Sequence, residues 1–284
     1  MLHENEAAEI LRQICQGEHM HPSEVKEGKI ELIADCEGVL KINTEKLNAV
    51  NNLGEMMIAS RHGNFPVKTG DKIAGTRIIP LVIEEEKMQK ACEVAGKEPI
   101  FRILPYQKKK AGIVTTGSEV YYHRIEDKFT PVVIEKLKEC GVTEVKQIQC
   151  NDDHEMIMEA IQTLIEDGSD LIVCTGGMSV DPDDRTPLAI KNACTEVVTY
   201  GAPVLPGAMF MLAYCEKEGR QIPVMGLPGC VMYAKRTIFD LVLPRIMCDE
   251  KLHEKDFRLL GQGGLCLSCP VCTFPNCGFG KGGY

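Results

Sequence analysis

The chain has 284 residues, of which 26% are charged, and it carries a formal net charge of -9 with a pI near 5.4. This length predicts one large or two medium domains with a full hydrophobic core. The negative charge argues against nucleic acid as a partner, because non-specific binding depends on Lys and Arg side chains that neutralise phosphates.

The N-terminal segment and the apolar runs indicate in which cellular compartment the protein is expected. No apolar run is as long as the roughly 18 residues that a membrane span needs, and the opening MLHENEAAEI lacks the basic and then apolar order of a signal peptide. Of the 14 cysteines, four crowd the C-terminal end and the others are scattered singly, as is typical of reduced core thiols. We therefore expect a cytoplasmic protein with no membrane partner.

The first part of the chain is rich in short strand patterns. From about residue 24 to residue 86, apolar stretches such as 29–34 alternate with turn residues at short intervals, which predicts a small β-rich domain. Residues 84–98 have a helical pattern, and residues 106–110 form a basic, extended linker. These features predict an N-terminal β-rich accessory domain over residues 1–107.

The second part, residues 108–250, alternates predicted strands and helices. The strands are expected at 112–116, 145–150, 171–174 and 222–225, and the helices at 131–140, 154–167 and 231–243. Such alternation implies right-handed crossovers, so we predict an α/β fold in which helices cover both faces of a parallel sheet in three layers. Residues 251–284 remain as a cysteine-rich tail that is expected to bind metal or to be disordered.

Four predicted strands end in unusual loops. Ligands of parallel sheets bind at the carboxyl ends of the strands, and here these ends read Thr116-Gly-Ser-Glu119, Asn151-Asp-Asp153, Thr175-Gly-Gly-Met-Ser179 and Gly226-Leu-Pro-Gly229. One glycine pair alone is usually a plain turn, whereas four such loops at one edge predict a ligand site. Backbone N–H groups around the glycines are expected to hold a phosphate without cationic side chains.

The loop after the central strand continues into a cluster of acids, Asp181, Asp183 and Asp184. Thr186 and Pro187 follow them and are expected to be the N-cap and the first residue of a helix. Because Thr186 already supplies a cap, a third carboxylate beside it favours a functional role for Asp184.

Asp152 and Asp153 have two interpretations. One of them caps the helix that begins near His154, or Asp152 binds Mg²⁺ or orients a reacting group. The sequence alone leaves both open.

Residues 111–245 resemble the Mog-type molybdopterin-binding domain shared by molybdopterin adenylyltransferases and molybdopterin molybdenumtransferases. The T-G-G and D-x-T-P pattern of the first group is similar to residues 175–177 and 184–187. The G-G-x-S-V and G-L-P-G pattern of the second is similar to residues 176–180, which end in Ser179 and Val180, and to residues 226–229. Both groups carry T-G-x-E, matched at 116–119, and the balance favours the molybdenumtransferases.

This resemblance implies a chemistry and a set of site residues. One group of relatives adenylylates molybdopterin with Mg-ATP, and the other releases AMP while it inserts molybdenum. By resemblance, Asp152 and Asp184 are the catalytic residues, which act through Mg²⁺ or near the incoming oxyanion. The residues implied to position molybdopterin are Thr116, Gly117, Glu119, Thr175, Gly176, Gly177, Ser179, Gly226, Pro228 and Gly229. Further implied are molybdate or tungstate as substrate, a homo-oligomer, and a molybdoenzyme as partner.

Departures from the family pattern keep two alternatives open. Cys230 and Val231 stand where molybdenumtransferases continue with Asn-Pro, and residues 205–210 replace a more basic glycine segment. The alternatives are a non-catalytic carrier or sensor of molybdopterin and a nucleotide pyrophosphatase on the same fold. Met178-Ser179 in place of Leu-Gly argues against the pyrophosphatase.

The tail carries a second signal in Cys266, Cys269, Cys272 and Cys277. Four thiols at such short spacing can converge on a metal. Zinc usually takes two separated C-x2-C pairs, whereas a continuous C-x2-C-x2-C run resembles iron–sulfur ligation with an altered last spacing. We expect these cysteines to bind metal, as either zinc or an iron–sulfur cluster.

Overall fold

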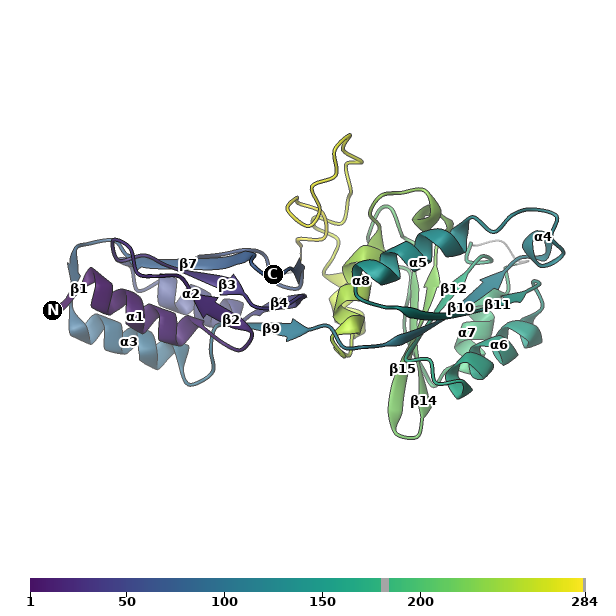
Figure 1. Cartoon of the computed structure of the whole chain (residues 1–284), viewed down its shortest axis with the longest axis horizontal. Helices are drawn as coiled ribbons and strands as arrows, with labels where there is room; N and C mark the ends of the chain where they lie inside the picture. The colour runs from purple at the N-terminus through teal and green to yellow at the C-terminus, as the bar shows by residue number, and fades with distance from the viewer. Residues whose placement is uncertain (180–183, 283–284) are drawn as a thin grey trace. The chain divides into compact units, whose positions relative to one another are not determined.

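The computed structural model describes residues 1–179 and 184–282. The chain divides into two compact units, Met1–Tyr106 and Gln107–Tyr284, each with its own hydrophobic core (Figure 1). Among the described residues, no helix is long and apolar enough to cross a membrane.

The first unit contains the expected strands in two small sheets and a pair of short strands. One sheet has the order β2 (Met20–Pro22), β3 (Ile30–Ala34), β7 (Lys72–Ile78) and β5 (Met56–Ser60). The other has the order β6 (Pro66–Val67), β4 (Gly38–Ile42) and β9 (Phe101–Pro105), and β1 (Leu2–His3) pairs with β8 (Val82–Ile83).

Helices complete the first unit, so it is mixed α/β rather than only β-rich. They are α1 (Glu4–Cys15), α2 (Thr44–Asn51) and α3 (Glu85–Ala95), of which the sequence predicted only α3. The start of α1 was missed because its cap is an unusual one: Nδ1 of His3 accepts from the N–H of Asn5, and Glu6 accepts from the N–H of His3. Leu11 on this helix is fully buried in the core.

The second unit is built on a sheet with the order β11 (Glu144–Cys150), β10 (Lys110–Thr116), β12 (Leu171–Thr175), β15 (Arg220–Leu227), β14 (Met211–Lys217) and β13 (Glu196–Tyr200). The first four strands are parallel, as predicted, whereas β14 is antiparallel to both neighbours and makes the sheet mixed. β14 and β15 are joined at Glu218 and Gly219, whose φ angles of 51° and 76° suit a two-residue hairpin turn.

Helices cover both faces of this sheet, which confirms the α/β class and its three layers. On one face lie α6 (His154–Glu166) and α7 (Thr186–Ala193), and on the other lie α5 (Phe129–Glu139) and α8 (Ile238–Met247) (Figure 1). The apolar side of α6 is buried in the core against β10, β11 and β12.

The predicted helix 231–243 is wrong. The structure has a 3₁₀ turn at Gly229–Met232, and α8 begins only after Thr237. Thr237 Oγ1 accepts from the N–H of Phe239 at 3.2 Å, and Asp240 accepts from the N–H of Thr237 at 2.7 Å. This capping box starts a new helix inside an apolar stretch that looked continuous.

A buried ion pair joins α5 to α8. Lys136 Nζ lies 2.7 Å from Asp240 Oδ1, and the two side chains are only 8% and 3% exposed. Arg236 also reaches Asp240, at 2.8 Å, and extends to the exposed Glu139 at 2.6 Å. The cluster therefore fixes the helices on this face of the sheet to one another.

The scattered cysteines are not all reduced thiols, as the sequence had suggested. Cys194, at the end of α7, and Cys215, in β14, form a disulfide. Other thiols do remain free in the cores: burial raises the pKa of Cys15 to about 12 and that of Cys150 to about 11. The pKa of Cys174 is raised by burial as well.

The described part of the tail packs against the second unit. It contains α9 (Glu254–Arg258), and its Phe257 and Phe279 are buried. The N–H of Leu205 donates to Gly264 O, and the N–H of Cys266 donates to Leu205 O, both at 2.8 Å. These two bonds pair the tail with the loop between β13 and β14.

Candidate functional site

The register of the sheet aligns the ends of its parallel strands. Thr116 pairs with Cys150, and Thr175 pairs with both Thr115 and Leu227. The loops that follow these residues therefore leave the sheet at one edge, where doubly wound folds bind ligands.

A cavity of about 540 Å³ lies at this edge. Residues of two predicted loops line it, namely Gly176, Gly177, Ser179, Asp184, Pro228 and Gly229. The T-G-G segment and the G-L-P-G segment, about 50 residues apart in the sequence, thus form walls of the same space.

The glycine pair is required by its surroundings. Gly176 and Gly177 have φ angles of 87° and 54°, values that side chains rarely adopt. A Cβ on Gly176 would lie 2.3 Å from the carbonyl oxygen of Thr116, and one on Gly177 would lie 2.7 Å from Thr186 Oγ1. The turn can pass this close to β10 and α7 only because it carries no side chains.

Buried hydroxyls support the turn from below. Thr116 Oγ1 donates to Thr175 O at 3.1 Å and lies 3.1 Å from Thr186 Oγ1. Thr186 was predicted to be the N-cap of α7, but it is the first residue of that helix, and Arg185 takes the cap position. The Thr186 hydroxyl lies against Thr116 instead of capping the helix. Thr175 Oγ1 is buried and has no hydrogen-bond partner among the described residues.

Asp184 closes the loop after β12. Its Oδ2 accepts from the N–H of Ser179 at 2.7 Å. Tyr200, at the end of β13, has a raised pKa, first because of burial and then because of the negative charge of Asp184. The pattern residues Val180, Asp181 and Asp183 lie outside the described part of the chain.

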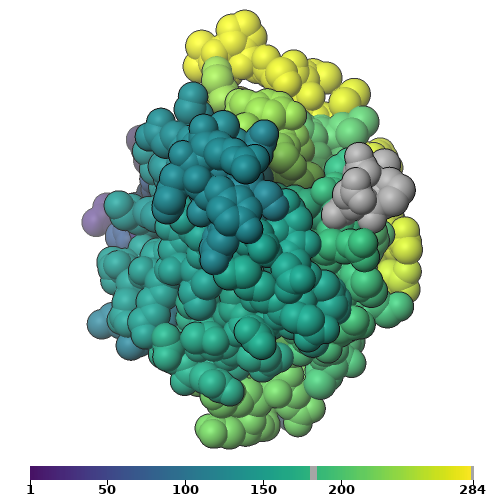
Figure 2. Space-filling model, turned by 90° about the vertical axis from the view of Figure 1, so that its right-hand side faces the viewer, coloured from purple at the N-terminus to yellow at the C-terminus, as the bar shows by residue number. Residues whose placement is uncertain are grey.

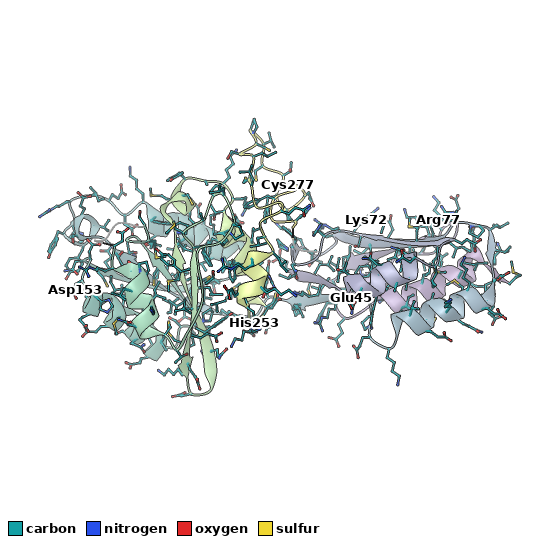
Figure 3. The ribbon with its side chains drawn as sticks, turned by 180° about the vertical axis from the view of Figure 1, so that it is seen from behind. Glu45, Lys72, Arg77, Asp153, His253 and Cys277 are labelled. Atoms are coloured by element: carbon teal, nitrogen blue, oxygen red, sulfur yellow. A yellow bond between two sulfur atoms is a disulfide. The ribbon has the colours of Figure 1, made fainter. Side chains whose placement is uncertain are left out.

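The structure separates the roles of the two neighbouring aspartates. Asp153 Oδ1 accepts from the N–H of Met156 at 2.9 Å and caps α6 (Figure 3). Asp152 Oδ2 instead accepts from both the N–H and the Oγ of Ser118, each at 2.8 Å. Asp152 thus links the loops after β10 and β11, and it is not one of the described residues that line the cavity.

Five other predicted residues are not among the described residues that line the cavity, namely Thr116, Gly117, Glu119, Thr175 and Gly226. Glu119 is exposed on the short helix α4 (Ser118–Tyr121), which follows Gly117 and lies on the surface shown in Figure 2. Gly226 is buried within β15, where a Cβ would lie 2.5 Å from the Met178 Cε atom. Gly226 therefore makes room for a core side chain.

Part of the cavity wall consists of residues that were not predicted from the sequence to belong to the site. Residues 205–209, Cys230 and Tyr233 also line the cavity, although residues 205–210 and Cys230 had been noticed as departures from the family pattern. The glycine at position 207 was the one usable signal in this segment of the sequence. The structure explains it, because φ of Gly207 is 128° and a Cβ there would lie 2.4 Å from Ile238 Cγ2. The described residues of the wall include no Lys or Arg, so an anion here would rely on backbone N–H groups.

The tail cysteines do not form a single-ion site. Among the described residues, no group of three or more His, Cys, Asp or Glu side chains is placed to hold a metal ion. Cys266, Cys269, Cys272 and Cys277 instead lie around a second cavity of about 310 Å³.

Comparisons with known proteins find similarity mainly in the second unit. Residues 112–247 match a family model described as "Probable molybdopterin binding domain". A CinA-like protein of Mycobacterium sp. (strain MCS) is 35% identical over 85 residues, which are 30% of this chain and 20% of that protein. The chain thus matches about a fifth of the length of this curated relative.

Two solved structures are similar to part of the chain. The tungsten cofactor synthesizing protein MoaB from Pyrococcus furiosus is 23% identical, with a TM-score of 0.39 over 44% of this chain and 84% of that one. A molybdopterin biosynthesis protein from Mycobacterium abscessus is 18% identical, with a TM-score of 0.41 over 50% and 92% of the two chains.

Proposed function

We propose that the cavity beside Gly176 and Gly177 binds molybdopterin and that the protein inserts molybdenum into it. The proposal is supported by the match of residues 112–247 to a family model described as "Probable molybdopterin binding domain". The observation that carries the proposal is the meeting of the glycine pair, Asp184 and the G-L-P-G loop around one cavity. In this activity water cleaves the phosphoanhydride bond of adenylylated molybdopterin, so that AMP leaves, and the two dithiolene sulfurs replace two oxygens of molybdate, which depart as water.

Positioning is the main work expected of this site. The cavity offers backbone N–H groups of a rigid glycine turn, and that turn is held by Thr116 and Thr186. Such preorganised donors stabilise charge that develops on a phosphate during the reaction. The buried, unpaired Oγ1 of Thr175 adds a polar atom just before the turn that a ligand or a water molecule would satisfy.

Asp152 and Asp184 are the proposed catalytic residues. Their donor atoms suit Mg²⁺, which proteins often hold through one or two carboxylates together with substrate phosphates. Asp184, which lines the cavity, would hold the ion there, and Asp152, whose Oδ2 is bound to Ser118 in the adjacent loops, would have to reach it from outside the described lining. The ion would supply positive charge that neutralises phosphate oxygens. Without the ion, the wall has a carboxylate and no cation among its described residues, so Asp184 would repel an approaching phosphate.

The test is an incubation of the purified full chain with adenylylated molybdopterin, Mg²⁺ and molybdate, in which AMP is measured over time. We expect AMP release that depends on molybdate, and a parallel reaction with tungstate tells which oxyanion is preferred. Omission of the oxyanion is the control.

The same assay separates the alternatives. Tight pterin binding without AMP release would favour a carrier or sensor. Hydrolysis of ADP-ribose without any pterin would favour a nucleotide pyrophosphatase. Homo-oligomer formation and delivery to a molybdoenzyme are part of the proposal and are measured by light scattering and by transfer to an apoenzyme.

A further inference from the structure

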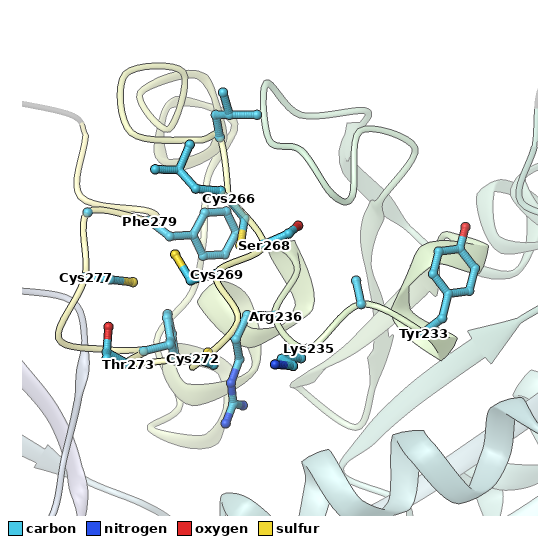
Figure 4. A pocket seen from close by; sticks show the side chains of 15 residues that line it. Tyr233, Lys235, Arg236, Cys266, Ser268, Cys269, Cys272, Thr273, Cys277 and Phe279 are labelled. Atoms are coloured by element: carbon cyan, nitrogen blue, oxygen red, sulfur yellow. The ribbon is translucent and has the colours of Figure 1, made fainter.

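The tail cysteines surround a space of their own. Cys266, Cys269, Cys272 and Cys277 all line the 310 Å³ cavity, together with Lys235 and Arg236 of the segment before α8 (Figure 4). Four cysteines from one short segment therefore line one cavity.

The spread of the thiols distinguishes between kinds of metal centre. A single zinc ion needs all four sulfur atoms at about 2.3 Å from one point, and no described group of side chains is placed in that way. A cubane cluster instead takes each thiolate on a separate iron, so its ligands lie around a volume rather than a point. Cys266, Cys269, Cys272 and Cys277 all line one cavity, which is what a cluster of the second kind requires of its ligands.

We propose that the tail binds an iron–sulfur cluster with these four cysteines as ligands. The sequence agrees with the geometry, because Cys266, Cys269 and Cys272 form the C-x2-C-x2-C run of bacterial cluster sites and Cys277 supplies the fourth thiolate.

The surroundings suit a negatively charged cluster. Phe274 and Phe279 form part of the wall, and Phe279 is only 4% exposed, so one side of the cavity is dry. Arg236 stacks over the Phe274 ring at 5.2 Å, and Lys235 Nζ donates to Pro270 O at 2.8 Å. These cations hold the tail in place and offset the charge of four thiolates, even though Arg236 also pairs with Glu139 and Asp240.

The other side of the cavity is open. The Cys269 and Cys272 residues are exposed, whereas Cys266 and Cys277 are half-buried. A cluster held here is reachable by oxygen and by chelators, so we expect it to be lost on exposure to air.

The test is anaerobic reconstitution of the full chain with ferrous iron and sulfide, followed by desalting and analysis of iron and acid-labile sulfide. We expect equal amounts of both, about four of each per chain, and a paramagnetic signal after reduction with dithionite. Cys272→Ser should reduce bound iron to the level of the untreated protein. Cys92→Ser is the matched control, because Cys92 is an exposed thiol on α3 in the other unit and should leave the iron content unchanged.

Three results would overturn the proposal. They are one zinc per chain with no uptake of iron, tail disulfides in the anaerobic protein, and equal iron loss in the two variants. Circular dichroism of each variant checks that the fold is intact. The AMP assay reads the other cavity, so failure of the cluster and failure of the proposed transferase activity are separate outcomes.

Discussion

The backbone N–H of Cys266 donates a 2.8 Å hydrogen bond to the carbonyl oxygen of Leu205. Leu205 lines the proposed pterin cavity, and its own N–H donates to Gly264 O in the same stretch of the tail. The cysteine tail and the cavity wall are therefore parts of one backbone ladder.

Removal of residues 261–284 should weaken molybdopterin binding by about thirtyfold, because two backbone bonds worth about 1 kcal/mol each no longer hold the loop at Leu205. Calorimetric titration measures the change. Leu267→Ser is the control, since this side chain is 78% exposed and its loss should leave binding unchanged. Equal affinity of the truncated and intact chains would show that the tail does not support the loop.

Asp184→Asn should lower AMP release on the order of a hundredfold, because it removes the charge but keeps an oxygen that accepts from the N–H of Ser179. The melting temperature should hardly change. Asp153→Ala is the matched control: loss of the α6 cap should cost about 1 kcal/mol of unfolding free energy, while the activity of the folded fraction is kept. Full activity of Asp184→Asn would exclude the proposed role.

Gly177→Ala should abolish pterin binding, because the added methyl would lie 2.7 Å from Thr186 Oγ1 and push the turn away from α7. Gly168→Ala provides the control, since Gly168 also has a positive φ, 87°, but has open space around it. Both variants should lose about 1 kcal/mol or more of unfolding free energy in urea. In equilibrium dialysis, only Gly177→Ala should fail to bind the pterin. Binding of the pterin by Gly177→Ala would mean that the turn does not need a glycine at this position.

Asp240→Ala should destabilise the second unit by about 3–5 kcal/mol, because it leaves Lys136 buried without its carboxylate. Glu139→Ala removes an exposed partner of the same cluster and should cost at most about 1 kcal/mol. Urea unfolding followed by circular dichroism compares the two. Similar costs for both variants would mean that burial does not set the strength of the cluster.

Stability should fall as the pH rises above 9. Burial raises the pKa of Cys15 from 9.0 to about 12, so the folded chain keeps a proton that the unfolded chain releases. The stabilisation is complete below pH 9 and is lost between pH 9 and about 12, at a rate of about 1.4 kcal/mol per pH unit. Cys15→Ala should flatten this slope in the first unit, as measured by urea unfolding at several pH values, and an unchanged slope would contradict the assignment.

The sequence predicted those elements whose apolar pattern is periodic and whose ends are marked. α6 follows an amphipathic run that ends before Gly168, and β12 is an unbroken apolar segment, so both lie where expected. β14 was missed although it too is apolar, because its pairing depends on the hairpin turn at Glu218-Gly219, a weaker signal than Asn-Gly. A break such as that at Thr237 is decided by one cap, which a continuous apolar pattern hides.

The loops that form the candidate site were predictable from the sequence, but the role of each residue in them was not. Loops after parallel strands must meet at one edge, so the meeting of Gly176 and Pro228 follows from topology. Which of Asp152 and Asp153 caps α6 depends on side-chain direction, and that is set by contacts with Ser118, distant in the sequence. The contribution of Tyr233 depends on the 3₁₀ turn before it, which the sequence did not reveal.

Tyr233 lines both the proposed pterin cavity and the cavity of the tail cysteines. A ligand that moves the Tyr233 ring on binding in one cavity would change the affinity of the other cavity for its own ligand. Linkage is reciprocal: whatever factor a filled tail adds to pterin affinity, bound pterin must add to retention of the tail ligand. Titration of the pterin with and without bound iron would measure this coupling free energy.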